Sequence, residues 1–117
     1  MKIIDRIFGW LLVIGAALHA YGSLMFYGPQ TVTLVWALAG SLAALLLAAL
    51  NLMRVNRPTD RTLAYVCFAG SLAWCAVALA FGVAQQNIVD PRVLYHAIVA
   101  LALAGFSAPG ALGKRGL

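Results

Sequence analysis

Four long apolar runs, separated by short polar segments, dominate the pattern of hydrophobic and polar positions along the chain. The runs cover about residues 7–27, 33–53, 63–83 and 93–108. None alternates with the two-residue period of a strand, and the first three approach the roughly 20 residues that a helix needs to cross a hydrocarbon core. Because a backbone in lipid must satisfy its own hydrogen bonds, runs of this length favour helices over barrel strands. The pattern predicts one all-α domain over residues 1–117, a four-helix transmembrane bundle.

Turn and capping signals fill the segments between the runs. Residues 28–30 (Gly-Pro-Gln) predict a tight turn, and Thr59 or Asp60 can cap the third helix. Residues 90–91 (Asp-Pro) predict the start of the fourth helix, and residues 109–110 (Pro-Gly) predict its end. Because connections this short join antiparallel neighbours, we expect the helices to run up-down-up-down.

Positive charges lie almost entirely on one side of the predicted bundle. Seven lysines and arginines fall on the side of both termini and the middle connection, and one arginine falls on the other side. Loops rich in Lys and Arg stay in the cytoplasm, so we expect an N-in/C-in orientation. The seven are Lys2, Arg6, Arg54, Arg57, Arg61, Lys114 and Arg115, and the eighth is Arg92.

The composition agrees with a lipid bilayer as the main partner of the chain. It is 64% hydrophobic and 9% charged, whereas soluble domains are about 25% charged. A soluble fold of 117 residues could not bury so much apolar surface. The net charge of +5 follows the helix ends and forms no basic strip, so we expect no nucleic-acid partner.

Small residues form a repeated string in the second and third runs. Residues 39–43 read Ala-Gly-Ser-Leu-Ala, and residues 69–73 repeat these five letters. Small side chains let helix backbones approach closely, and serine can hydrogen-bond across the contact. We expect Gly40 and Ser41 to pack near Gly70 and Ser71, while a relic of duplication remains the alternative.

The apolar runs lack the residues on which most membrane chemistry depends. Their interiors contain no Asp, Glu, Lys or Arg, although proton-coupled pumps carry such groups within the membrane. Small four-helix multidrug exporters have a similar length and topology, but they rely on a Glu in the first span. The sequence also contains no Gly-rich phosphate loop and no C-x-x-C, H-E-x-x-H or G-x-S-x-G motif. We therefore expect no enzymatic activity.

Two histidines, His19 and His96, are the ionisable groups that remain within the runs. Each lies about one or two helical turns from the non-cytoplasmic end of its helix, on the first and fourth helices. Facing each other, they could ligate a b-type haem axially or contact a quinone. Two ligands are too few for zinc, so we expect no metal site.

A structural role is the interpretation that we favour for both histidines. His19 can hydrogen-bond a hydroxyl such as that of Ser41 or Tyr21, and His96 can lie half solvated near the headgroups. A proton relay is a further alternative. Trp74 lies in the middle of the third run, where its indole N–H needs a partner.

Over its full length the chain resembles the small, uncharacterised four-span inner-membrane proteins of bacteria. The resemblance is carried by the seven-to-one charge distribution, the His-Ala pairs at 19–20 and 96–97, and the string that begins at Trp36. It implies a multi-pass protein of the bacterial inner (plasma) membrane and no particular activity.

Three functions follow as hypotheses. The leading one is a non-enzymatic accessory, structural or partner-binding subunit, acting as a homo-oligomer or beside a larger membrane protein. The second is a redox subunit in which His19 and His96 hold haem or touch a quinone. The third is an oligomeric transporter or channel for a small neutral or lipophilic solute, with a path through Ser41, Ser71, His19 and Trp74.

Overall fold

The protein consists of four α-helices joined by short turns. The computed structural model describes residues 2–113, and within that range it contains α1 (Lys2–Tyr27), α2 (Thr31–Val55), α3 (Arg61–Ala84) and α4 (Pro91–Ala111), with no strand. All four helices are long and apolar enough to cross a membrane. The predicted four-helix transmembrane bundle is confirmed, and the chain is a multi-pass membrane protein.

The helices extend beyond the apolar runs from which they were predicted. α1 already begins at Lys2, so Asp5 lies within its first turn. The prediction that Pro109 and Gly110 end the last helix is wrong, because α4 continues to Ala111. Pro109 removes only the bond to the carbonyl one turn earlier, and with two helical residues after it there is little helix to displace.

Side-chain caps begin the third and fourth helices where the sequence places them. The Asp60 carboxylate accepts a hydrogen bond from the backbone N–H of Leu63 at 2.9 Å. The Asp90 carboxylate accepts one from the backbone N–H of Arg92, also at 2.9 Å, and Pro91 occupies the first helical position. Each cap satisfies a backbone donor that a helix start would otherwise leave unpaired.

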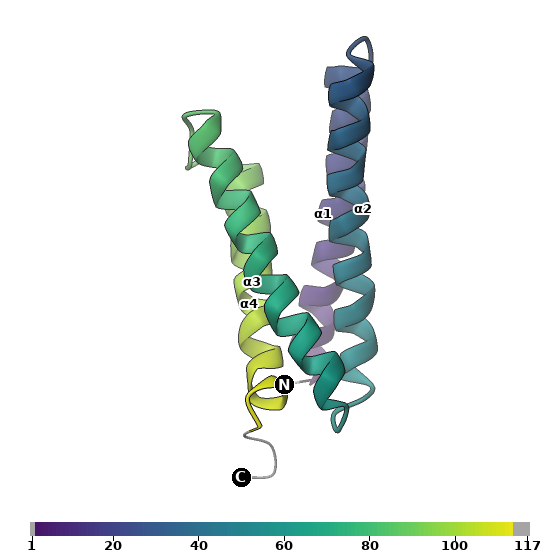
Figure 1. The fold of residues 1–117 in the computed structure, drawn as a ribbon, viewed down its shortest axis with the longest axis vertical. Coiled ribbons are helices and arrows are strands. Elements are labelled where there is room, and N and C mark those ends of the chain that lie inside the picture. Colours follow the sequence, from purple (N-terminus) through teal and green to yellow (C-terminus); the bar gives the residue numbers. More distant parts are fainter. Residues whose placement is uncertain (1, 114–117) are drawn as a thin grey trace.

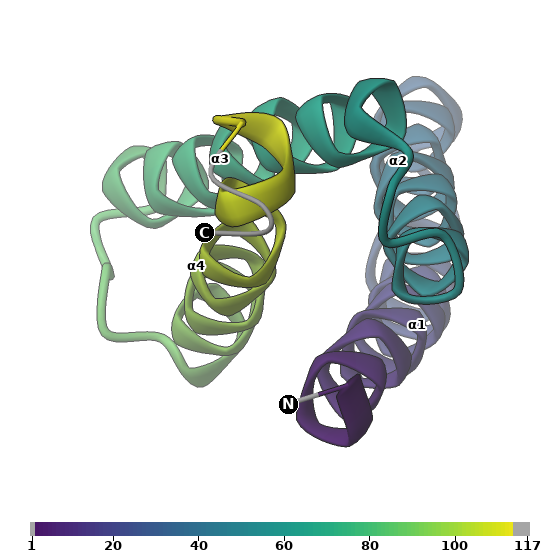
Figure 2. The ribbon, with the colours of Figure 1, turned by 90° about the horizontal axis from the view of Figure 1, so that it is seen from below.

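The helices pair into two hairpins that meet at one end and separate at the other (Figure 1). α1 packs along α2, and α3 packs along α4, whereas the contacts between the hairpins are fewer. α3 is inclined, so that its first turns lie against α2 and its last turns lie away from it (Figures 1 and 2). The start of α1 and the end of α4 lie at the end where the hairpins meet, here called the basic end (Figure 1). The opposite end is called the open end.

The shared core lies between the hairpins on the side of the basic end. It consists of leucines and valines interlocked with alanines, whose small side chains let the helices approach. Its fully buried members include Leu12, Ala44 and Leu103. Phe8, Leu11, Val13, Trp74 and Tyr95 pack against its edge.

The two small-residue strings lie near the contact of α2 with α3, but they do not pair with each other. A Cβ on Gly70 would come within 2.9 Å of Leu47, and Ser71 accepts a hydrogen bond from Asn51 at 3.4 Å. Gly40 instead lies toward the open end, where a Cβ would approach His19 and Trp74 at 3.7 and 4.0 Å. Gly40 lies 15 residues before the end of α2 (55 − 40), whereas Gly70 lies only 9 residues after the start of α3 (70 − 61). The strings are therefore offset along the axis, and each one packs against larger residues.

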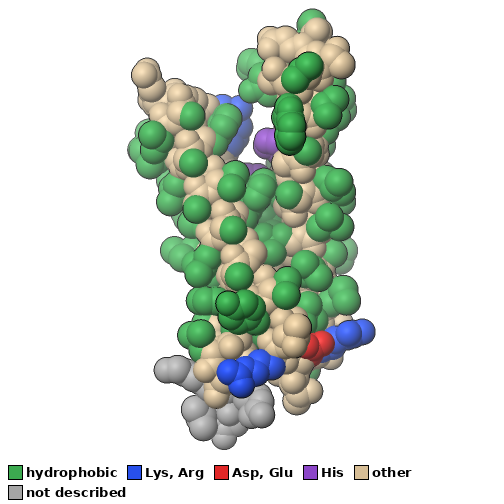
Figure 3. Space-filling model, in the orientation of Figure 1, with side chains coloured by type: hydrophobic (Ala, Val, Ile, Leu, Met, Phe, Trp, Pro, Cys, Tyr) green, Lys and Arg blue, Asp and Glu red, His purple; other side chains and the backbone are tan. Residues whose placement is uncertain are grey.

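Large apolar side chains cover the outside of both hairpins (Figure 3). Ile3, Trp10, Leu42, Leu46 and Ile98 are among about thirty that are exposed. A soluble monomer rarely exposes an apolar surface of such extent, whereas lipid solvates it. The exposed surface is thus the one that contacts the acyl chains.

A buried polar cluster joins three helices at the basic end. Arg54 of α2 donates to both carboxylate oxygens of Asp5 on α1, each at 2.8 Å, and to the Asn51 side-chain oxygen at 2.9 Å. Asn51 donates in turn to Ser71 of α3. Among residues 2–113, every buried side-chain nitrogen and oxygen has a hydrogen-bond partner. Because each of these polar atoms has a partner, the cluster can hold charged groups away from water.

Candidate functional site: the inter-hairpin cavity

The separation of the hairpins leaves a cavity of about 570 Å³ toward the open end. All four helices line it, and this space is called the inter-hairpin cavity below. Its lining residues are Leu18, His19, Gly22, Ser23, Phe26, Tyr27, Thr33, Trp36, Ala37, Gly40, Trp74, Val77, Ala78, Phe81, Gln85, Arg92, Val93 and His96. A volume of this size lies within the range of roughly 300–1,000 Å³ that is typical of small-molecule sites.

His19 lies on the α1 wall of the cavity and is held by the hairpin to which it belongs. Its Nδ1 is 2.6 Å from the hydroxyl oxygen of Ser41 on α2, so the predicted contact with Ser41 is confirmed. One turn further along α1, the Ser23 hydroxyl donates to the carbonyl of His19 at 2.7 Å. The ring is therefore fixed at Nδ1, while its Nε2 has no hydrogen-bond partner among the described residues.

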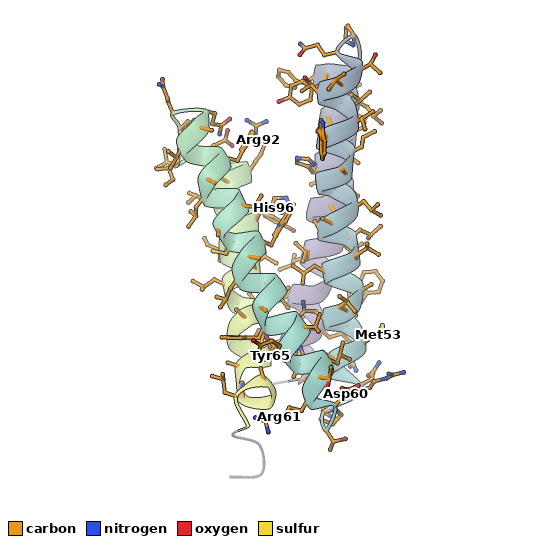
Figure 4. All side chains as sticks on the ribbon, in the orientation of Figure 1. Met53, Asp60, Arg61, Tyr65, Arg92 and His96 are labelled. Atoms are coloured by element: carbon orange, nitrogen blue, oxygen red, sulfur yellow. The ribbon has the colours of Figure 1, made fainter. Side chains whose placement is uncertain are left out.

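His96 lies opposite, on α4, and is held by the other hairpin (Figure 4). The indole N–H of Trp74 on α3 donates to His96 Nδ1 at 3.1 Å, which gives Trp74 the partner that its position required. Because Trp can only donate, Nδ1 is an acceptor and the proton of the neutral ring is on Nε2. The neighbouring Tyr95 hydroxyl donates to the Leu11 carbonyl at 2.6 Å and ties α4 to α1 below the cavity.

The two histidines lie close together, with ring centroids 6.3 Å apart and ring planes at 79°. This separation and this angle would suit two axial ligands of one iron, so the directions of the ring nitrogens decide between the interpretations. His96 Nε2 faces Gly15, only 3.2 Å from the position that a Cβ there would take. Axial ligation needs both coordinating nitrogens to point at one iron. The geometry thus favours the hydrogen-bonding interpretation of the histidines over the haem interpretation.

At the rim of the cavity, the positive charge of Arg92 is paired with the negative charge of Asp90. The Arg92 guanidinium donates to both carboxylate oxygens of Asp90, at 2.6 and 3.0 Å, and Gln85 donates to the same carboxylate at 3.2 Å. Hydrogen bonds from Arg92 hold the pKa of Asp90 well below its ordinary value. The side-chain bond contributes most, and the bond from the backbone N–H contributes next. The carboxylate therefore stays ionised at neutral pH, and the rim is close to electrically neutral.

Aromatic side chains supply much of the apolar wall. Trp36 and Phe26 come from the α1–α2 hairpin, and Trp74 and Phe81 come from the α3–α4 hairpin. Flat rings provide a large contact area at little conformational cost, and an indole also offers an N–H. Apolar walls with a few fixed polar atoms are the usual character of a site for a small ligand.

Sequence reasoning identified some of these residues and missed others. It singled out His19, His96 and Trp74, and the structure brings all three to one cavity. It used Trp36 only as the start of a residue string and gave no role to Phe26, Phe81 or Gln85. Their positions near the open ends of the helices were visible, but helix rotation decides which of them face the cavity.

We predict that Trp74→Phe lowers the free energy of unfolding by about 1–2 kcal/mol, because it leaves His96 Nδ1 without its donor in a half-buried site. Trp10→Phe is the matched control, since Trp10 is 56% exposed on the outside of α1. Its expected effect is within about 0.5 kcal/mol. Unfolding in mild detergent, followed by circular dichroism, measures both, and equal losses would contradict the assigned hydrogen bond.

Comparison with protein families, with curated proteins and with solved structures finds no match for this chain. Among residues 2–113, no group of three or more His, Cys, Asp or Glu side chains lies close enough together to hold a metal ion.

Proposed function

We propose that this chain is a non-enzymatic membrane accessory protein that binds a small lipophilic molecule with a hydrogen-bonding group in the inter-hairpin cavity. The observation that carries the proposal is the cavity itself, about 570 Å³ of space between aromatic walls with His19 and His96 beside it. A hairpin pair built only for structural support would gain stability by closing this gap with side chains.

The character of the lining supports a neutral and largely apolar ligand. The charge of Arg92 is matched by Asp90, so the cavity presents no uncompensated cation to an anionic ligand. Among the described residues, His19 Nε2 has no hydrogen-bond partner, and it can hydrogen-bond one group on the ligand. Long alcohols, ketones and quinone-like rings have this combination of an apolar body and a single polar site.

The proposal includes an orientation and a location. The seven-to-one charge distribution supports a cytoplasmic basic end, and the cavity would then open on the opposite side of a bacterial inner membrane. An accessory protein of this kind acts beside a second copy or a larger membrane protein that receives or supplies the ligand. The transporter hypothesis would in addition require a path through the buried core and the polar cluster at the basic end.

Tryptophan fluorescence tests the proposal, because two of the three tryptophans line the cavity. Trp36 is 74% exposed and would also meet probe dissolved in the bilayer. In lipid nanodiscs, a protein with Trp10→Phe and Trp36→Phe therefore reports only on Trp74. A protein with Trp36→Phe and Trp74→Phe reports only on Trp10, outside the cavity. The probe is a brominated octanol, whose bromine quenches tryptophan on contact.

We expect Trp74 to be quenched along a saturating curve, because a cavity holds a limited number of probe molecules. Trp10 should be quenched in simple proportion to the probe dissolved in the bilayer. Proportional quenching of both proteins with the same slope would overturn the proposal.

A further inference from the structure

A second pocket of about 230 Å³ lies at the basic end and shares no lining residue with the inter-hairpin cavity. Residues from the start of α1, the end of α2, the following connection and the end of α4 surround it. They are Lys2, Asp5, Arg54, Val55, Arg57, Pro58, Ala64, Phe106, Ser107, Pro109 and Gly110. Three of the eleven are basic and one is acidic.

The positive charges around this pocket are not equivalent. Arg54 is buried, and its guanidinium is committed to Asp5 and Asn51. Lys2 and Arg57 are exposed, and neither is in an ion pair within residues 2–113. The Arg54–Asp5 pair is neutral as a unit, so the pocket carries the charge of two available cations.

The opposite wall of the pocket is apolar. Phe106 and Pro109 of α4 face it together with Ala64 of α3. A site with two cations on one side and an apolar surface on the other matches the junction of a phospholipid, where a phosphate meets the glycerol and the first methylenes. The pocket lies where the helices end, which is the depth of the headgroups in a bilayer.

We infer that this pocket binds the phosphate of an anionic phospholipid, with Lys2 and Arg57 as the phosphate ligands and Phe106 and Pro109 against the start of the acyl chains. Arg57 can offer parallel N–H donors to two phosphate oxygens, and Lys2 adds a point charge. The buried Arg54–Asp5 pair forms the floor that holds these elements in place. The site is independent of the inter-hairpin cavity.

The alternative is that basic residues at this end attract anionic lipid without any defined site. Two double variants with the same change of charge separate the possibilities. Lys2→Gln with Arg57→Gln removes both cations of the pocket. Arg6→Gln with Arg61→Gln removes two cations from the same end that do not line it. All four side chains are exposed, so both proteins should fold with nearly unchanged stability.

The experiment measures the thermal unfolding midpoint of the full chain in mild detergent with added phosphatidylglycerol, phosphatidylcholine or inorganic phosphate. A ligand that binds only the folded state raises this midpoint. We expect phosphatidylglycerol to raise it by several degrees in the wild type and in the Arg6/Arg61 variant, and by less than half as much in the Lys2/Arg57 variant. Phosphatidylcholine and inorganic phosphate should raise it little.

Equal shifts in the two double variants would overturn the site in favour of diffuse attraction. A full shift with inorganic phosphate alone would overturn the lipid assignment in favour of a soluble phosphate compound. A full shift with phosphatidylcholine would show that the charge of the lipid is irrelevant and would also contradict the inference.

Discussion

Asp5→Ala is expected to destabilise the protein by about 3–5 kcal/mol, the cost of leaving a buried charge without its partner. The Arg54 side chain is only 7% exposed, and the carboxylate accepts two of its hydrogen bonds at 2.8 Å. Without Asp5, the guanidinium keeps only the Asn51 oxygen. The first turn of α1 would separate from the last turn of α2, which weakens the α1–α2 hairpin at the basic end.

Two further variants show whether the loss of stability in Asp5→Ala comes from the broken ion pair or from the loss of the Asp5 side chain as such. Asp5→Ala combined with Arg54→Met removes both charges and should recover most of the loss, because an apolar pair of similar volume often substitutes for a buried ion pair. Arg6→Ala removes an exposed hydrogen bond to Asn56 and should cost less than about 0.5 kcal/mol. Chemical unfolding in mild detergent measures all three. A double variant as unstable as Asp5→Ala would contradict this explanation.

Gly22→Phe is expected to weaken binding in the inter-hairpin cavity at least tenfold, or about 1.4 kcal/mol. Gly22 lines the cavity, and a Cβ placed on it meets no atom within 4 Å. The ring would therefore enter the cavity without displacing the helices, and it would occupy the space that the ligand needs. Replacing a helical glycine also removes a conformational cost, so the variant should fold at least as well as the wild type.

Gly105→Phe provides a matched control on the outside of α4. A Cβ on Gly105 likewise meets no atom within 4 Å, and this residue does not line the cavity. The two variants share the same substitution, the same gain in helix propensity and the same added apolar area. Quenching by brominated octanol should saturate normally in Gly105→Phe and become proportional in Gly22→Phe. Equal curves would show that the probe binds elsewhere.

The number and order of the helices were predictable because they depend on local properties of the sequence. Runs of about 20 apolar residues and the caps at Asp60 and Asp90 are visible without knowledge of the fold. The contact of His19 with Ser41 was also predictable as an alternative, since a polar residue in lipid needs a polar neighbour and few are present. The same reasoning required a partner for the indole of Trp74.

The angle between the hairpins and the rotation of each helix could not be predicted, because the apolar runs are hydrophobic on all sides. As a result, the sequence did not distinguish the aromatic residues that line the cavity, such as Trp36 and Phe81, from those that face lipid. It also did not pair Asp5 with Arg54, which are 49 positions apart. Arg54 lies near a helix end, where membrane topology seemed a sufficient explanation for its charge, and Asp5 was given no role.

Photolabelling of the full chain in nanodiscs with a diazirine-bearing octanol, mapped by mass spectrometry, tests the binding cavity most directly. We predict saturable labels on the cavity-lining parts of α1, α2 and α3, near His19, Trp36 and Trp74, that unlabelled octanol displaces. They should persist in Gly105→Phe and disappear in Gly22→Phe. Labels spread evenly over the lipid-facing residues of all four helices, unchanged by Gly22→Phe, would contradict a ligand site between the hairpins.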